Sequence, residues 1–225
     1  MSGNWSPQVL RHGAEGEPVV VIDGFAPDPA RFVDDAAFLS FGRMGEHYPG
    51  VRAPIAPAML RAGLDALAPV AREVFGAASI ETADAFYSLV TTPPSELAPI
   101  QRLRHFDGVE PDRLALLLYL SRDERSGTAF YRHRSTGFET VDAARLPFYR
   151  AALEADLRRE GLPAPAYLAG NTPVFERIAA HQGLFNRAIL YRSLTLHCAL
   201  IPPDLTLSAD PEAGRLTANV FLATA

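Results

Sequence analysis

Two histidines and one aspartate in this chain have the types and the order of a metal-binding set. His105 and Asp107 are two residues apart, and His197 follows far downstream. Residues two apart in an extended strand point to the same face, so His105 and Asp107 can bind one ion while a distant strand supplies His197. Two His and one carboxylate leave coordination positions open, as in mononuclear non-haem iron(II) sites. The spacing therefore predicts a metal enzyme.

Arg215 begins the apolar C-terminal segment GRLTANVFLAT. On a strand, Arg215 would share one face with Thr217 and Asn219, and the apolar residues between them would occupy the other face. All 21 basic side chains are arginines, so any fixed cation that binds a carboxylate ligand must be an arginine, whose planar fork suits bidentate recognition. Schiff-base chemistry on a lysine is excluded.

Hydrophobic periodicity predicts the elements that would position these residues. The first half predicts a buried strand and turn at 18–25, a helix at 28–41, an exposed loop at 47–54 and an amphipathic helix at 58–76, which Pro69 would kink. Later segments predict strands at 84–92, 99–108, 113–121, 127–134, 185–193, 194–202 and 214–224, and helices at 142–160 and 173–183.

This order of elements predicts a mainly β fold with flanking helices, in the α+β class. We expect a single domain over residues 1–225, with a double-layered barrel or jelly roll at about 84–225 and a helical insertion at about 142–183. A strand and a helix lead into it.

Composition excludes several classes of protein. A net charge of −5 and the lack of a basic cluster argue against nucleic-acid binding. No apolar segment has the length of a membrane span, and the N-terminal residues lack the pattern of a secretory signal. We therefore expect a cytoplasmic protein without membrane contacts. The single cysteine, Cys198, allows no internal disulfide.

Short motifs follow one another in a distinctive order across residues 84–223. They are His-Phe-Asp at 105–107, a strand at 114–121 ending in Tyr-Leu-Ser, Gly-Thr-Ala-Phe at 127–130, a strand at 187–193, His197, and Arg-Leu-Thr at 215–217. In this order the chain resembles the iron(II)- and 2-oxoglutarate-dependent dioxygenases, in their prolyl 4-hydroxylase-like branch. The resemblance implies a double-stranded β-helix in which His105, Asp107 and His197 bind Fe(II).

The resemblance also implies a cosubstrate and a reaction. 2-Oxoglutarate would chelate the iron, and Arg215 would bind its distal carboxylate with help from the hydroxyl of Thr128, Thr217 or Tyr119. O2 would take the last position on the metal. The expected reaction hydroxylates an amino-acid, peptide or small-molecule substrate while 2-oxoglutarate is decarboxylated to succinate.

Four further residues are candidates for contacts with the substrate or cosubstrate. Arg102 stands three residues before His105, where the resembled branch often has a tyrosine that helps to bind 2-oxoglutarate, and Tyr87 on a neighbouring strand is the candidate replacement. Asn219 shares the expected face of Arg215. His133 ends a strand near the expected mouth of the barrel, where it either contacts substrate or lies in a solvated turn.

Two other functions are compatible with the same residues. A cupin-like protein could bind a metal or a small ligand without oxygen chemistry. Alternatively, the insertion at 142–183 could be a docking surface of an interaction module, in which case the two histidines and the aspartate need not converge. No pattern in the sequence predicts the oligomeric state.

Overall fold

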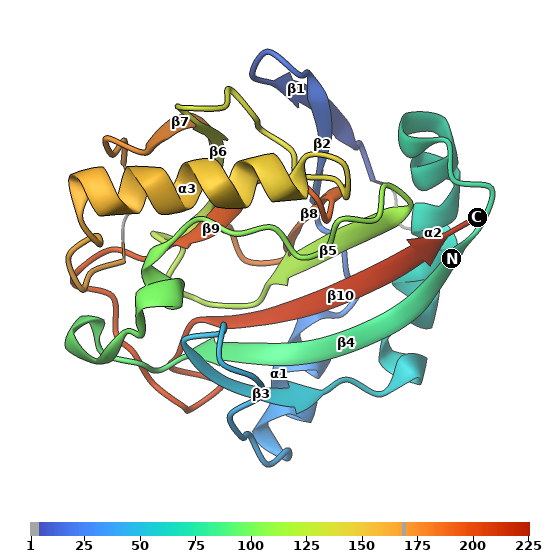
Figure 1. Cartoon of the computed structure of the whole chain (residues 1–225). Coiled ribbons are helices and arrows are strands. Elements are labelled where there is room, and N and C mark those ends of the chain that lie inside the picture. Colours follow the sequence, from blue (N-terminus) through green and yellow to red (C-terminus); the bar gives the residue numbers. More distant parts are fainter. Residues whose placement is uncertain (1–4, 168–169) are drawn as a thin grey trace.

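Two antiparallel β-sheets form the centre of the molecule (Figure 1). The computed structural model describes residues 5–167 and 170–225. The large sheet has the strand order β1-β2-β8-β5-β10-β4-β3, and the small sheet has the order β7-β6-β9. The strands are β1 (Gln8–His12), β2 (Glu17–Asp23), β3 (Gly50–Pro54), β4 (Ile80–Val90), β5 (Arg113–Tyr119), β6 (Gly127–His133), β7 (Phe175–Gln182), β8 (Arg187–Arg192), β9 (His197–Leu200) and β10 (Leu216–Thr224). This arrangement confirms the predicted jelly roll with flanking helices.

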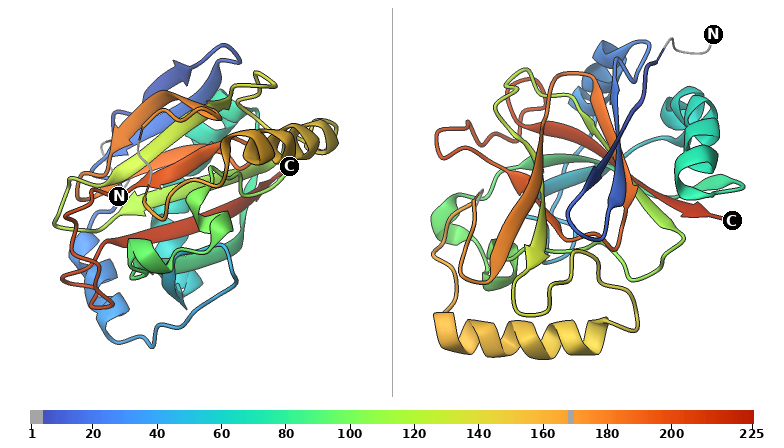
Figure 2. Two further views of the ribbon diagram at one scale, coloured as in Figure 1. Left: turned by 60° about the vertical axis from the view of Figure 1, so that its left-hand side comes forward. Right: turned by 90° about the horizontal axis from the view of Figure 1, so that it is seen from above.

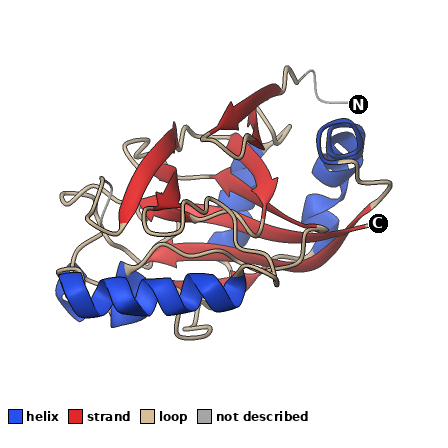
Figure 3. Ribbon diagram, turned by 45° about the horizontal axis from the view of Figure 1, so that its top comes forward, coloured by secondary structure: helices blue, strands red, loops and turns tan. Residues whose placement is uncertain are grey.

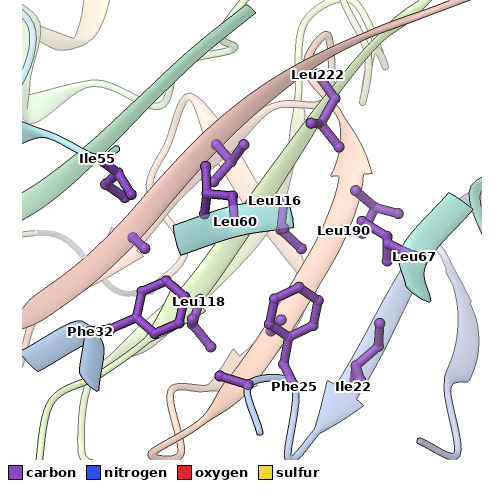
Figure 4. Close-up of a cluster of buried hydrophobic side chains, with 14 of the residues drawn as sticks. Ile22, Phe25, Phe32, Ile55, Leu60, Leu67, Leu116, Leu118, Leu190 and Leu222 are labelled. Atoms are coloured by element: carbon purple, nitrogen blue, oxygen red, sulfur yellow. The ribbon is translucent and has the colours of Figure 1, made fainter. Parts of the chain in front are cut away.

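Two helices cover the outer face of the large sheet. α1 (Pro29–Ala37) starts after Asp28, whose carboxylate accepts a hydrogen bond from the backbone N–H of Arg31 at 3.3 Å. α2 (Pro57–Phe75) continues through Pro69 and ends at Gly76, whose φ of 75° favours glycine. Figure 4 shows side chains from both helices packed against alternate residues of the central strands, among them Phe32, Leu60, Leu67, Leu116, Leu118 and Leu190.

The alternate residues of the same strands face inward, toward the small sheet. Leu117 and Tyr119 of β5 and Ile189 of β8 pack there against Phe130 of β6. The central strands are therefore apolar on both faces, because one face packs against helices and the other against a second sheet.

The third helix, α3 (Leu146–Glu160), lies on the opposite side of the strands from α1 and α2 (Figures 2 and 3). Tyr149 attaches it to the small sheet, since its ring lies 5.1 Å from the His133 ring and 5.9 Å from the Phe106 ring, centre to centre. α3 confirms the helix predicted within residues 142–160. None of the helices in the described part of the chain has the length and apolarity that a membrane span requires.

The predicted insertion of 142–183 is only partly helical. Residues 175–182 form β7, which pairs with β6 along its whole length, and so the helix predicted at 173–183 is wrong. A short window with apolar residues spaced three to four apart fits either structure, and here pairing with a neighbouring strand determines the outcome.

Two further segments differ from the prediction. The expected loop at 47–54 contains β3, which pairs with β4. The strand expected at 99–108 is replaced by the short 3₁₀ helix η2 (Pro99–Arg102), which follows η1 (Pro94–Glu96). η2 starts with proline, and the Gln101 side chain accepts a hydrogen bond from the backbone N–H of Ala98 at 3.0 Å, which stabilises this turn.

Candidate functional site

A single antiparallel bridge brings the two histidines together. The backbone N–H of His105 donates to the carbonyl of His197 at 3.0 Å, and the N–H of His197 donates back to the carbonyl of His105 at 2.8 Å. The backbone N–H of Asp107 donates to the carbonyl of Ser193 at 2.7 Å. These bonds fix the backbone at His105 and Asp107, and both side chains reach the same point although no regular strand forms.

The three side chains converge on one point. One ligand atom from each of His105, Asp107 and His197 lies within 4.8 Å of the other two. The Nε2 atoms of His105 and His197 lie 3.7 and 3.5 Å from the Asp107 carboxylate oxygens. Ligand atoms at about 2.1 Å from a common ion, at right angles, would be about 3.0 Å apart, so small side-chain shifts suffice for coordination.

The second nitrogen of His197 is fixed by a backbone group. Its Nδ1 lies 2.9 Å from the carbonyl oxygen of Thr195, and a carbonyl can only accept, so Nδ1 carries the proton. The Nε2 lone pair is therefore free for an ion, as in most metal-binding histidines. Desolvation in the cavity, reinforced by the nearby His197, lowers the pKa of His105 to about 4. His105 is thus neutral at physiological pH, which is the form that binds metals.

The cluster opens into a large cavity. Its volume is about 750 Å³, within the range of pockets for small molecules. Strands of both sheets, α3 and the segment 44–52 contribute to its wall. The cavity is open to solvent, and the His105 side chain remains 52% exposed, so a ligand can enter next to the cluster.

Arg215 lies in the wall of this cavity and is 3% exposed. Its Nη2 donates to the carbonyl of Gly127 at 3.1 Å, and its guanidinium lies 5.9 Å from the centre of the Tyr119 ring. Its Nε is buried without a hydrogen-bond partner in residues 5–167 and 170–225. A buried cation with an unsatisfied donor is unfavourable unless a ligand completes its bonding.

The residues predicted to assist Arg215 differ in their access to the cavity. Thr217 and Asn219 line it, and the Thr217 hydroxyl donates to the side-chain oxygen of Asn219 at 2.9 Å. Thr128 also lines it and accepts a hydrogen bond from the Tyr119 hydroxyl at 2.7 Å. Tyr119 is therefore behind the cavity wall, where its ring and hydroxyl support Arg215 and Thr128.

Two predicted substrate contacts are wrong. Tyr87 is fully buried on the helix-covered face of the large sheet, where its hydroxyl donates to the Asp35 carboxylate of α1 at 2.9 Å. Strand alternation explains the error, since the neighbouring Phe86 points into the cavity. His133 is also fully buried: its Nε2 lies 3.1 Å from the Asp156 carboxylate of α3, and it lines neither a turn nor the cavity.

Arg102 does line the cavity, as expected for a residue close to His105. Its guanidinium donates two hydrogen bonds to the carbonyl of Leu97, at 2.6 and 2.9 Å. Those bonds hold η2 against the preceding turn, so part of the binding capacity of Arg102 serves the fold.

Sequence reasoning missed Tyr48 and Arg52, which both line the cavity. The Arg52 guanidinium lies 4.2 Å from the centre of the Tyr48 ring. Both residues fall in the segment that its Pro and Gly residues led us to read as an exposed loop. The alternation of Val51, Arg52 and Ala53 was the available signal, because Ala53 is fully buried while Arg52 faces the cavity.

Solved structures share this architecture at low sequence identity. The non-heme alpha ketoglutarate dependent epimerase SnoN from nogalamycin biosynthesis matches with a TM-score of 0.54 and 13% identity, over 93% of this chain and 78% of that one. HygX from Streptomyces hygroscopicus, with nickel and 2-oxoglutarate bound, has the same score and identity, over 93% and 84%. The carbocyclase SnoK from nogalamycin biosynthesis matches at 0.52 and 15%, over 93% and 80%. At such identities the likeness is one of fold.

Fold and geometry together define a double-stranded β-helix protein with two histidines and an aspartate converging beside a large cavity. A search of curated protein sequences found no significant match. Residues 3–222 match the Family of unknown function (DUF6445), and the chain belongs to that family.

Proposed function

We propose that this protein is an iron(II)- and 2-oxoglutarate-dependent oxygenase, of the prolyl 4-hydroxylase-like branch, that hydroxylates an amino-acid, peptide or small-molecule substrate. The observation that carries the proposal is the convergence of His105, Asp107 and His197 next to the buried Arg215. A likeness of fold to the non-heme alpha ketoglutarate dependent epimerase SnoN and to HygX with 2-oxoglutarate bound supports it.

The residues of the site fit both iron(II) and 2-oxoglutarate. Two neutral imidazoles and one carboxylate suit iron(II) and leave positions open for other ligands. The unsatisfied Nε of Arg215 suits a carboxylate, which could accept from Nε and from a terminal nitrogen together. When iron(II), 2-oxoglutarate and O2 are bound, such a site converts a substrate C–H bond to C–OH while 2-oxoglutarate loses CO2 and becomes succinate.

Each residue has a task that follows from its surroundings. The backbone bridge between His105 and His197 sets the spacing of the ligands before any ion binds. The carbonyl of Thr195 keeps His197 in the tautomer that presents Nε2. Arg215 orients a dicarboxylate toward the cluster, and Thr217 and Thr128 offer hydroxyl groups in the same wall.

The decisive experiment is an anaerobic titration of the purified protein with Fe(II) and then with 2-oxoglutarate, followed by visible absorption. We expect a metal-to-ligand charge-transfer band. His197→Ala should lose both iron and the band. Arg215→Gln should keep iron but raise the Kd for 2-oxoglutarate at least about tenfold, because hydrogen bonds to charged groups contribute about 1.5–3 kcal/mol.

Arg61→Gln is the matched control, because it removes the same charge from an exposed position of α2 outside the cavity. It should leave both titrations nearly unchanged. Absence of the band at millimolar 2-oxoglutarate would refute the oxygenase assignment. Iron binding without the band would instead indicate a catalytically silent, cupin-like metal-binding protein.

A further inference from the structure

The cavity has more positive charge than one cosubstrate requires. Six arginines line it against two aspartates, although the whole chain has a net charge of −5. Of the two aspartates, Asp107 belongs to the metal-binding cluster, and the Asp84 carboxylate lies 3.5 Å from the guanidinium of Arg113. The remaining arginines are Arg52, Arg102, Arg104, Arg150 and Arg215.

Most of these guanidinium groups already have partners or contact solvent. Arg102, Arg104 and Arg215 each donate to a backbone carbonyl, at 2.6, 2.9 and 3.1 Å respectively. Arg150 is exposed, so water satisfies its donors. Arg52 differs from them, because it is partly buried and its guanidinium makes no hydrogen bond or ion pair with the described residues.

The Arg52 guanidinium is bound by ring faces alone. It lies 4.2 Å from the centre of the Tyr48 ring and 5.7 Å from that of Phe86. Its Nε is buried without a hydrogen-bond partner in the described segments, while the residue as a whole is partly exposed, so its terminal nitrogens can be reached from the cavity. Burial lowers the pKa of Arg52, which nevertheless stays charged at physiological pH. An anion bound in the fork of Arg52 would satisfy these donors.

Arg52 is placed to bind something other than the cosubstrate. β4 separates it from the strand that Arg215 precedes: Arg52 of β3 and Thr217 of β10 both pair with Ser88 of β4, from opposite sides. Arg52 also lines the same cavity as His105, Asp107 and His197. An anion at Arg52 would thus lie near the metal-binding cluster while Arg215 remains available to a second one.

The rest of the cavity wall is largely apolar. Met44 and Ile100 remain 40% and 45% exposed where the cavity opens. Phe106, Leu146 and Leu153 continue this apolar lining along α3. Such a wall favours a ligand whose body is apolar or aromatic.

We propose that the substrate is an organic acid with an apolar or aromatic body, whose carboxylate is bound by Arg52 beside the metal-binding cluster. This assignment rests on the proposed function, since it gives Arg215 to 2-oxoglutarate and Arg52 to the substrate. It deepens that function by naming the chemical class of the substrate.

Two fluorescent probes test the anion site directly. 1-Anilinonaphthalene-8-sulfonate is an aromatic anion, and N-phenyl-1-naphthylamine is its uncharged counterpart. We would titrate each into the full chain, with and without saturating 2-oxoglutarate. Arg52→Gln should raise the Kd of the sulfonate at least about tenfold, the low end for a charge-assisted hydrogen bond, and change that of the neutral probe less than twofold. Arg61→Gln, which removes the same charge outside the cavity, should change neither by more than about twofold.

A competition experiment on the unaltered protein tests whether the site prefers a carboxylate to an uncharged amide. Phenylacetate should displace the sulfonate probe from the unaltered protein at least about tenfold more effectively than phenylacetamide does. Equal displacement would overturn the proposal, even if Arg52→Gln failed to fold. A melting temperature measured for each variant identifies that failure.

Two other results would also overturn the proposal. One is an unchanged affinity for the sulfonate in a folded Arg52→Gln protein. The other is a loss of 2-oxoglutarate affinity in Arg52→Gln as large as that in Arg215→Gln, which would make Arg52 a cosubstrate residue. These titrations need neither iron nor turnover, so failure of the charge-transfer experiment would refute the oxygenase assignment and leave the anion site standing.

Discussion

Replacing Tyr87 with phenylalanine separates a structural role from a role in the site. The Tyr87 hydroxyl is fully buried and donates to the Asp35 carboxylate at 2.9 Å, which attaches α1 to the large sheet. Burial and the Asp35 charge raise the pKa of Tyr87 well above its ordinary value, so this hydroxyl remains a donor at any ordinary pH. Tyr87→Phe removes the donor and leaves the ring packing intact.

The expected cost follows from the environment of the bond. A hydrogen bond to a charged group contributes about 1.5–3 kcal/mol, and Asp35 is only partly buried, so water can replace the lost donor. We therefore expect a loss of about 1.5 kcal/mol in the free energy of unfolding. For a chain of this length that corresponds to a decrease of about 3–6 °C in the melting temperature.

Urea denaturation followed by circular dichroism measures this loss. A double-mutant cycle with Asp35→Ala should assign about 1 kcal/mol to the coupling between the two residues. The Kd for 2-oxoglutarate should be unchanged in Tyr87→Phe, because the side chain lies on the far face of the sheet. An unchanged stability combined with a weaker affinity for 2-oxoglutarate would show that Tyr87 faces the cavity and that our placement is wrong.

Two more predictions concern His181 and Gly127. Burial, with help from His12, lowers the pKa of His181 to about 4 from 6.5, so the unfolded chain binds the proton first as the pH falls. The free energy of unfolding, measured by urea denaturation, should therefore decrease by up to about 3 kcal/mol between pH 6.5 and pH 4. His181→Phe should reduce this pH dependence. Gly127→Ala would place a Cβ 2.2 Å from the His181 carbonyl oxygen and so displace the carbonyl that holds Arg215. It should lower stability by about 1–3 kcal/mol and weaken 2-oxoglutarate binding in calorimetry, whereas Gly42→Ala, which has open space, should do neither.

The parts of the fold that sequence predicted are those with long apolar periodicity. α2 and β5 are examples. The apolar residues of α2 recur with the period of a helix and those of β5 form a short continuous run typical of a buried strand, so each pattern excludes the alternative. β3 and β7 were missed because short strands depend on pairing with β4 and β6, which are distant in sequence. The residues of a short strand do not by themselves indicate which distant strand it will pair with.

The same division applies to the candidate site. The neighbourhood of His105 and Asp107 was predictable from their two-residue spacing, and His197 was added from its residue type and from the family resemblance. The positions of Tyr87 and His133 were not, because the face of a strand depends on register and His133 is paired with a helix that starts 13 residues later. Arg52 was hidden by the Pro and Gly residues around it.

The bridge between His105 and His197 has a consequence for how the molecule can open. His197 begins a strand of the small sheet, while Asp107 is bonded to the carbonyl that follows β8 of the large sheet. The three candidate ligands therefore connect the large sheet to the small sheet. Separating the sheets there would disperse the ligands, and a bound ion would oppose that separation, so metal occupancy and sheet docking are thermodynamically linked.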